Sequence, residues 1–161
     1  MINVRRATAA DAAELVRLRG ILIAAMHDHL PADGGWQQQA QMTLEKRLLA
    51  PEPTLVAFVV AQPDAPSRLA ACAVGTVEER LGGPGNPDGL TGYVFNVATD
   101  PAHRRRGYSR WCTTALLAWY RDHGIATVDL RATPPAEPLY RSLGFERTAD
   151  PAMRLHITGT A

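Results

Sequence analysis

The segment that most constrains the fold is a strand, a basic turn and an amphipathic helix in direct succession. Residues 93–99 (YVFNVAT) have the β-branched and aromatic composition of a strand, and residues 126–132 (ATVDLRA) predict another. The helix between them begins near Ser109, which could cap it, stops at Gly124 and has one apolar face: Cys112, Ala115, Leu116 and Trp119. Such a βαβ unit points the helix N-terminus at the carboxyl edge of a sheet. We therefore expect an α/β fold.

The rest of the chain supplies further elements of the same fold. Residues 2–6 alternate as a short strand, and Thr8 with Asp11 forms a capping box for a helix whose buried face is Leu15, Leu18, Leu22, Ala25 and Met26. Apolar residues every four positions from Trp36 to Leu48 predict a second helix. Residues 54–61 and 68–79 predict a β-hairpin, and residues 134–157 predict a short helix and one or two final strands. No linker or repeat interrupts residues 1–161, which we interpret as one domain.

Composition excludes several classes of protein. A net charge of +1 and a pI of about 7.9 argue against a general nucleic-acid binder. No stretch approaches the roughly 18 apolar residues of a membrane span, and the N-terminus lacks the apolar core of a signal peptide. Cys72 and Cys112 lie in apolar runs without metal-ligand spacing, which indicates small core residues and no metal site. These features predict a cytoplasmic protein that binds neither nucleic acid nor membrane.

The basic turn predicts a local anion site. Four of the seventeen Lys and Arg residues fall within residues 104–110. The first amides of a helix have no intrahelical partner and carry partial positive charge, so Gly107, Tyr108 and Ser109 can present N–H groups to a phosphate. The turn matches neither GxxxxGK[ST] nor GxGxxG, which removes the usual signatures of ATP and NAD binding.

Three segments together resemble the GCN5-related N-acetyltransferases (GNAT family), which transfer acetyl from acetyl-CoA to amines. Residues 104–109 (RRRGYS) are similar to the family's R/Q-x-x-G-x-G/A loop, with Ser109 in place of Gly or Ala. Residues 96–101 (NVATDP) resemble the end of the family's fourth strand, and residues 138–145 (PLYRSLGF) resemble its L-Y-x-x-L-G-F segment. The order of elements fits the family from Ile2 to Ile157.

The resemblance implies a mixed, mostly antiparallel sheet of six to seven strands, with helices on both faces. A bulge should splay the fourth strand from the fifth, and the pantetheine arm of CoA should lie in that gap. The implied CoA-binding residues are Val97, Ala98, Thr99, Arg104, Arg105, Arg106, Gly107, Tyr108, Ser109 and Arg110. Thr133 would replace an asparagine that usually contacts the CoA arm in the family.

The resemblance also implies a reaction, in which a primary amine attacks acetyl-CoA directly in a ternary complex. The amide of Val97 is the candidate donor to the oxyanion. Tyr140 is the candidate acid, since a phenol with a pKa of about 10 is protonated at neutral pH and can donate to a thiolate. Cys112 as a nucleophile is the rival, but its place on the apolar face of a helix favours a structural role.

The general base and the acceptor stay open at the level of sequence. Asp129 is the candidate base, with Glu78, Glu79 or water as alternatives, and an ion pair with Arg131 or a helix arginine would instead make Asp129 structural. The acceptor site should be formed by the first two helices and residues 81–89, and should include Met26, His27, His29 and Trp36. A CoA-binding sensor without turnover is the alternative function. The sequence fixes neither the acceptor nor the oligomeric state, and a homodimer is left open.

Overall fold

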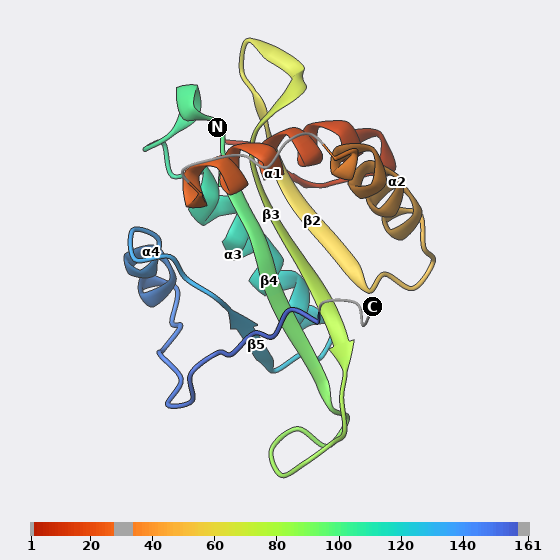
Figure 1. Cartoon of the computed structure of the whole chain (residues 1–161), viewed down its shortest axis with the longest axis vertical. Helices are drawn as coiled ribbons and strands as arrows, with labels where there is room; N and C mark the ends of the chain where they lie inside the picture. The colour runs from red at the N-terminus through yellow and green to blue at the C-terminus, as the bar shows by residue number, and fades with distance from the viewer. Residues whose placement is uncertain (1, 28–33, 158–161) are drawn as a thin grey trace. The chain divides into compact units, whose positions relative to one another are not determined.

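The computed structural model describes residues 2–27 and 34–157 (Figure 1). The chain divides into two units, one ending at Arg131 and one beginning at Ala132. The first unit holds a sheet with the order β1-β2-β3-β4-β5. Its strands are β1 (Val4–Arg6), β2 (Leu55–Gln62), β3 (Ala65–Glu79), β4 (Leu90–Thr99) and β5 (Thr127–Leu130).

The sheet is mixed, as predicted, and mostly antiparallel. The first three strand pairs are antiparallel, and β4 pairs with β5 in parallel. Within the described residues the sheet has five strands, so the expectation of six to seven is wrong. The strands expected after residue 145 are absent from residues 146–157, whose side chains are all exposed. Without burial on either face, the apolar residues of that segment gain little from extended pairing.

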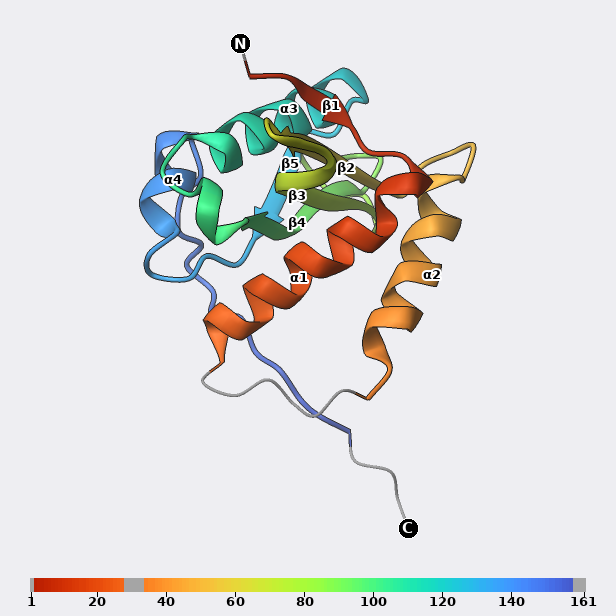
Figure 2. The same ribbon diagram turned by 90° about the horizontal axis from the view of Figure 1, so that it is seen from above.

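Helices cover both faces of the sheet. The helices are α1 (Ala12–Met26), α2 (Trp36–Leu48) and α3 (Tyr108–Asp122), with short 3-10 turns η1 (Ala9–Asp11) and η2 (Pro101–His103). Figure 2 shows α3 on one side of the strands, and α1 and α2 on the other. The alternation of β2 divides its side chains between two cores, one with Val56 and Val60 towards α3 and one with Ala57 and Val59 towards α1.

The helix ends agree with the sequence in part. The Thr8 and Asp11 capping box is present at the start of η1, and α2 has the predicted bounds. Leu15 and Leu18 are buried as expected, whereas Ala25 and Met26 are exposed, because the last turn of α1 extends past the core. No helix in residues 2–27 and 34–157 has the length and apolar character needed to cross a membrane.

The second unit contains α4 (Glu137–Ser142) and the turn that follows it. The carbonyl of Thr133 accepts hydrogen bonds from the amides of Ala136 and Glu137 at 2.9 and 3.1 Å, which starts the helix. Glu137 pairs with Arg147 and Arg141 at 2.7 and 2.8 Å. The two guanidinium groups hold the pKa of Glu137 at about 2.

Candidate active site

The centre of the candidate site is a β-bulge in β4. Val94 is opposite Gly75 and Asn96 is opposite Val74, so Phe95 is an extra residue in β4. In the described part of the chain, β5 pairs with Thr91–Val94 only. The strand β4 therefore leaves β5 at the bulge, and residues 95–99 form an edge on that side, as the family resemblance implied.

Backbone alternation determines which groups of β4 face this edge. The amide of Asp100 donates to the carbonyl of Ala70 on β3 at 2.8 Å. Backbone groups of a strand point alternately to its two neighbours, so Asn96, Ala98 and Asp100 face β3. The N–H and C=O groups of Val97 and Thr99 consequently face the edge that β5 leaves.

The basic turn continues from the end of β4 into α3. Arg105 has a φ of 61° and Gly107 a φ of 77°, both in the left-handed region. Successive turns of this kind direct several N–H groups to one side, as in anion-binding nests. The N-cap of α3 is Gly107 and not the expected Ser109. Because glycine has no side chain, the first amides of the helix have no hydrogen bond from an N-cap side chain. Ser109 instead contacts the hydroxyl of Thr99 at 2.5 Å and so joins the helix to β4.

Positive charge is exposed around this turn. Arg104, Arg105 and Arg106 are exposed, and none of them has an ion pair with a described residue. Arg110 is exposed in the first turn of α3. Backbone amides at a helix N-terminus and arginine side chains are the groups that commonly bind phosphates in proteins.

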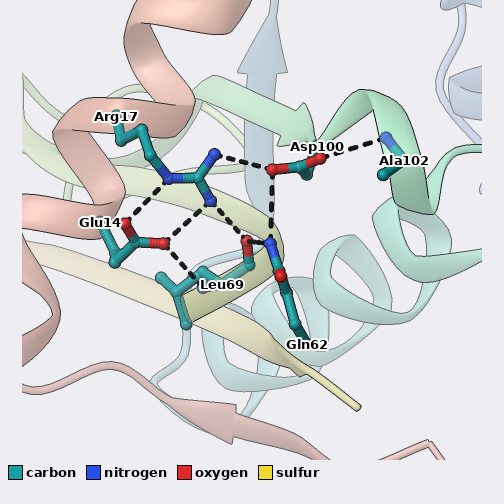
Figure 3. A network of polar contacts seen from close by, with 6 residues as sticks. All are labelled: Glu14, Arg17, Gln62, Leu69, Asp100 and Ala102. Carbon is teal, nitrogen blue, oxygen red and sulfur yellow. Dashed lines mark hydrogen bonds and ion pairs between the residues drawn. The ribbon is translucent and has the colours of Figure 1, made fainter. Parts of the chain in front are cut away.

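A polar network that sequence reasoning missed supports the start of this turn (Figure 3). Arg17 on α1 donates to Asp100 at 2.7 Å, to Glu14 at 2.8 Å and to the carbonyl of Leu69 at 2.8 Å. Asp100 also accepts from the amide of Ala102 at 3.1 Å, which fixes η2. The spacing of Glu14 and Arg17 indicates a helical pair, but nothing local identifies a partner 83 positions further on.

This network should make stability depend on pH. Burial alone would raise the pKa of Glu14 and of Asp100, but hydrogen bonds to each carboxylate outweigh burial and lower both pKa values. Glu14 accepts these hydrogen bonds from Arg17 and from the Leu69 amide. Asp100 accepts them from the Ala102 amide and from Arg17. A carboxylate whose pKa is lower in the folded state stabilises the fold above its unfolded pKa of about 4. This stabilisation is lost as pH falls through the folded pKa.

We expect the free energy of unfolding in urea to decrease as the pH is lowered below about 4. Arg17→Met should flatten this fall, and an unchanged slope would contradict the assignment.

Asp129 lies on the face of β5 opposite to α3. Val128 and Leu130 pack against the α3 core, so alternation turns Asp129 to the face that α1 and α2 cover. It is half-buried and pairs in register with Tyr93. No ion pair joins Asp129 to Arg131 or to any other described residue. By contrast, Glu78 pairs with Arg80 at 2.6 Å, and Glu79 is exposed.

A pocket of about 440 Å³ lies on the same face of the sheet, between α1, α2 and the bulge. Trp36, Phe95 and Asn96 are among its lining residues. Of the expected acceptor residues, only Trp36 lines it, since Met26 and His27 are exposed at the end of α1 and His29 lies outside the described residues. Residues 81–89 do not contribute to this pocket, so that part of the expectation lacks support.

The two cysteines are core residues. Cys72 and Cys112 are fully buried and neither forms a disulfide. Burial raises the pKa of Cys72 to about 12 and raises that of Cys112 further above its ordinary value. A thiol that stays protonated is a poor nucleophile, which supports the structural interpretation. The described residues contain no cluster of ligands that could hold a metal ion.

Tyr140 and Thr133 belong to the second unit. Tyr140 is buried on α4, with its ring edge-on to Phe145 at 5.9 Å, and burial raises the pKa of its hydroxyl. A raised pKa keeps the phenol protonated at neutral pH, which an acid requires. The roles of both residues stay predictions.

Comparison with known proteins identifies the family of this chain. The chain belongs to the acetyltransferase (GNAT) family, whose model matches residues 22–145. The family that the sequence resembles is thereby confirmed.

Two curated relatives have names that point to different kinds of acetyl transfer. Mycothiol acetyltransferase of Rhodococcus erythropolis is 30% identical over 141 residues, which cover 85% of this chain and 44% of that protein. The ribosomal protein bS18-alanine N-acetyltransferase of Haemophilus ducreyi is 37% identical over 57 residues, which cover 34% of this chain and 39% of that protein. The chain thus spans less than half the length of these curated relatives.

A solved structure shows the same fold. A predicted acetyltransferase from Clostridium acetobutylicum, crystallised with acetyl-CoA, has a TM-score of 0.82 at 21% identity. The match covers 97% of this chain and 96% of that one. The mixed α/β fold predicted from the sequence is therefore that of the family.

Proposed function

We propose that this protein transfers acetyl from acetyl-CoA to a primary amine by direct attack in a ternary complex. The observation that carries this proposal is the edge of β4 beyond the bulge, which leads into the arginine turn at the N-terminus of α3. The pantetheine arm would pair along Val97, Ala98 and Thr99, and the pyrophosphate would bind at residues 104–110. Thr133 would contact the CoA arm. The acyltransferase domain is proposed to span residues 1–161.

Each step of the reaction has a candidate group. The amine nitrogen forms a bond to the thioester carbonyl carbon, and the oxyanion accepts a hydrogen bond from the amide of Val97. The C–S bond then breaks, and the CoA thiolate takes the proton of the Tyr140 hydroxyl. The amine loses its proton to Asp129, directly or through one water. No acyl-enzyme is formed, in agreement with the burial of both cysteines.

The acceptor is proposed to be an amine of a small molecule or of a protein. The two curated relatives support both classes, because one is named for the small molecule mycothiol and the other for the alanine of ribosomal protein bS18. The cytoplasmic location and the absence of nucleic-acid partners stay predictions, and a homodimer stays open.

A panel of primary amines tests the function. Release of free CoA thiol should depend on both acetyl-CoA and one class of amine, and the acetylated amine should appear in equal amount. Binding of acetyl-CoA in calorimetry without thiol release for any amine would contradict the proposal and favour a CoA-binding sensor.

Asp129→Asn tests the assignment of the base. If Asp129 accepts the amine proton, the rate of the variant should be depressed most where the amine is protonated, and the deficit should shrink as pH rises. The measurement is kcat/KM against pH, with Asp122→Asn as a control at the exposed end of α3. A loss that is uniform across pH, with a lower melting temperature, would assign Asp129 to the scaffold and leave Glu78, Glu79 or water as the base.

A further inference from the structure

We infer that the pocket between α1, α2 and the bulge holds a carboxylate of the acceptor, and that Arg19 binds it. This inference rests on the proposed function, since it specifies the acceptor of the same reaction. Arg19 is half-buried and lines the pocket from α1. Its guanidinium lies 5.9 Å from the centroid of the Phe95 ring and donates to the Asn96 side-chain oxygen at 3.4 Å.

The charge of Arg19 has no carboxylate partner among the described residues. Arg17, two positions earlier, engages Glu14 and Asp100, and Arg5 engages Asp11. The hydrogen bond from Arg19 to Asn96 is long and its acceptor is neutral. A guanidinium fork of this kind fits the two oxygens of a carboxylate.

The pocket itself favours an anion. Its lining residues include Arg19 and Arg47 but no Asp or Glu. Arg47 donates to the carbonyl and the hydroxyl of Thr54, both at 3.1 Å, and adds a second positive charge to the wall. Trp36 and Leu44 supply apolar surface, where a charged hydrogen bond is less screened than in water.

The position of the pocket links recognition to chemistry. Phe95 and Asn96 line it, and the next residue of β4 is Val97, whose amide faces the edge. An acceptor held by its carboxylate at Arg19 would thus present its amine beside the bulge. The substrate class is a small primary amine that also carries a carboxylate.

The test compares matched amines on matched variants. We would measure kcat/KM for β-alanine, glycine and phenylalanine and for their carboxamides, with wild type, Arg19→Gln and the control Arg121→Gln at the exposed end of α3. Each acid-to-amide ratio in the variant is divided by that of wild type, so differences in amine pKa cancel. Arg19→Gln should lower the ratio about 10- to 100-fold, and Arg121→Gln should leave it unchanged.

Other outcomes are equally decisive. An unchanged acid-to-amide ratio in Arg19→Gln would overturn the inference. The ratio of kcat/KM for phosphoethanolamine to that for ethanolamine is measured in the same way. If Arg19→Gln lowers only this second ratio, the pocket binds phosphate and the inference is also overturned. If no amine is acetylated, the proposed function fails. Calorimetry on CoA-saturated protein then tests separately whether the pocket binds the carboxylates. Binding of the carboxylates to wild type but not to Arg19→Gln supports the inference, and equal or absent binding to both overturns it.

Discussion

Gly107→Val is expected to abolish measurable binding of acetyl-CoA while the fold persists. Gly107 has a φ of 77° at the N-cap of α3, a conformation that is costly for a β-branched residue. A Cβ at this position would meet Trp111 no closer than 3.7 Å, so the effect comes from the backbone and not from a collision. If the valine shifts the turn, the amides that follow no longer converge on a pyrophosphate.

Gly124→Val provides the matched control, because it has a φ of 72° and lies just after the other end of α3. A Cβ there meets nothing within 4 Å. Both variants should lose about 1–2 kcal/mol of stability, because each places a β-branched residue in the left-handed region of φ. Calorimetry should show loss of acetyl-CoA binding for Gly107→Val only. Unchanged affinity in Gly107→Val would remove the turn from the cofactor site.

Tyr140→Phe should lower turnover about 10²- to 10⁴-fold and leave the affinity for acetyl-CoA nearly intact. The substitution removes the proton that the thiolate would take and keeps the ring that packs against Phe145. The measurement is single-turnover acetyl transfer with the best amine, together with calorimetry of acetyl-CoA.

Tyr120→Phe controls for the loss of a buried phenol. The Tyr120 hydroxyl donates to the carbonyl of Thr76 at 2.9 Å, so its removal should cost about 1 kcal/mol of stability without changing the rate. A Tyr140→Phe variant that keeps the full rate while chemistry limits turnover would place the acid elsewhere.

Local patterns predicted most of the first unit. The capping box at Thr8, the four-residue spacing in α2 and the apolar face of α3 depend on contacts within a few positions, and each is present in the structure. The bulge at Phe95 was expected from the family resemblance alone. No local signal in residues 93–99 specifies an inserted residue.

Features that depend on distant residues could not be predicted in this way. The network of Arg17 and Asp100 joins α1 to the end of β4, and the pocket of Arg19 requires α1, α2 and β4 together. The strands expected after residue 145 failed for the related reason that an apolar pattern forms a strand only where a partner buries it. Ser109 was a reasonable cap by residue type, but the left-handed Gly107 starts α3 two positions earlier.

The most direct test of direct acetyl transfer is mass spectrometry with acetyl-CoA labelled in the acetyl group. Wild-type protein and one equivalent of labelled acetyl-CoA are mixed first without amine and then with the best amine from the panel. We expect the intact protein to keep its unlabelled mass in the first step, and the label to appear on the amine in the second. Label on the protein before amine is added, or the absence of labelled amine after the second step, would contradict direct acetyl transfer.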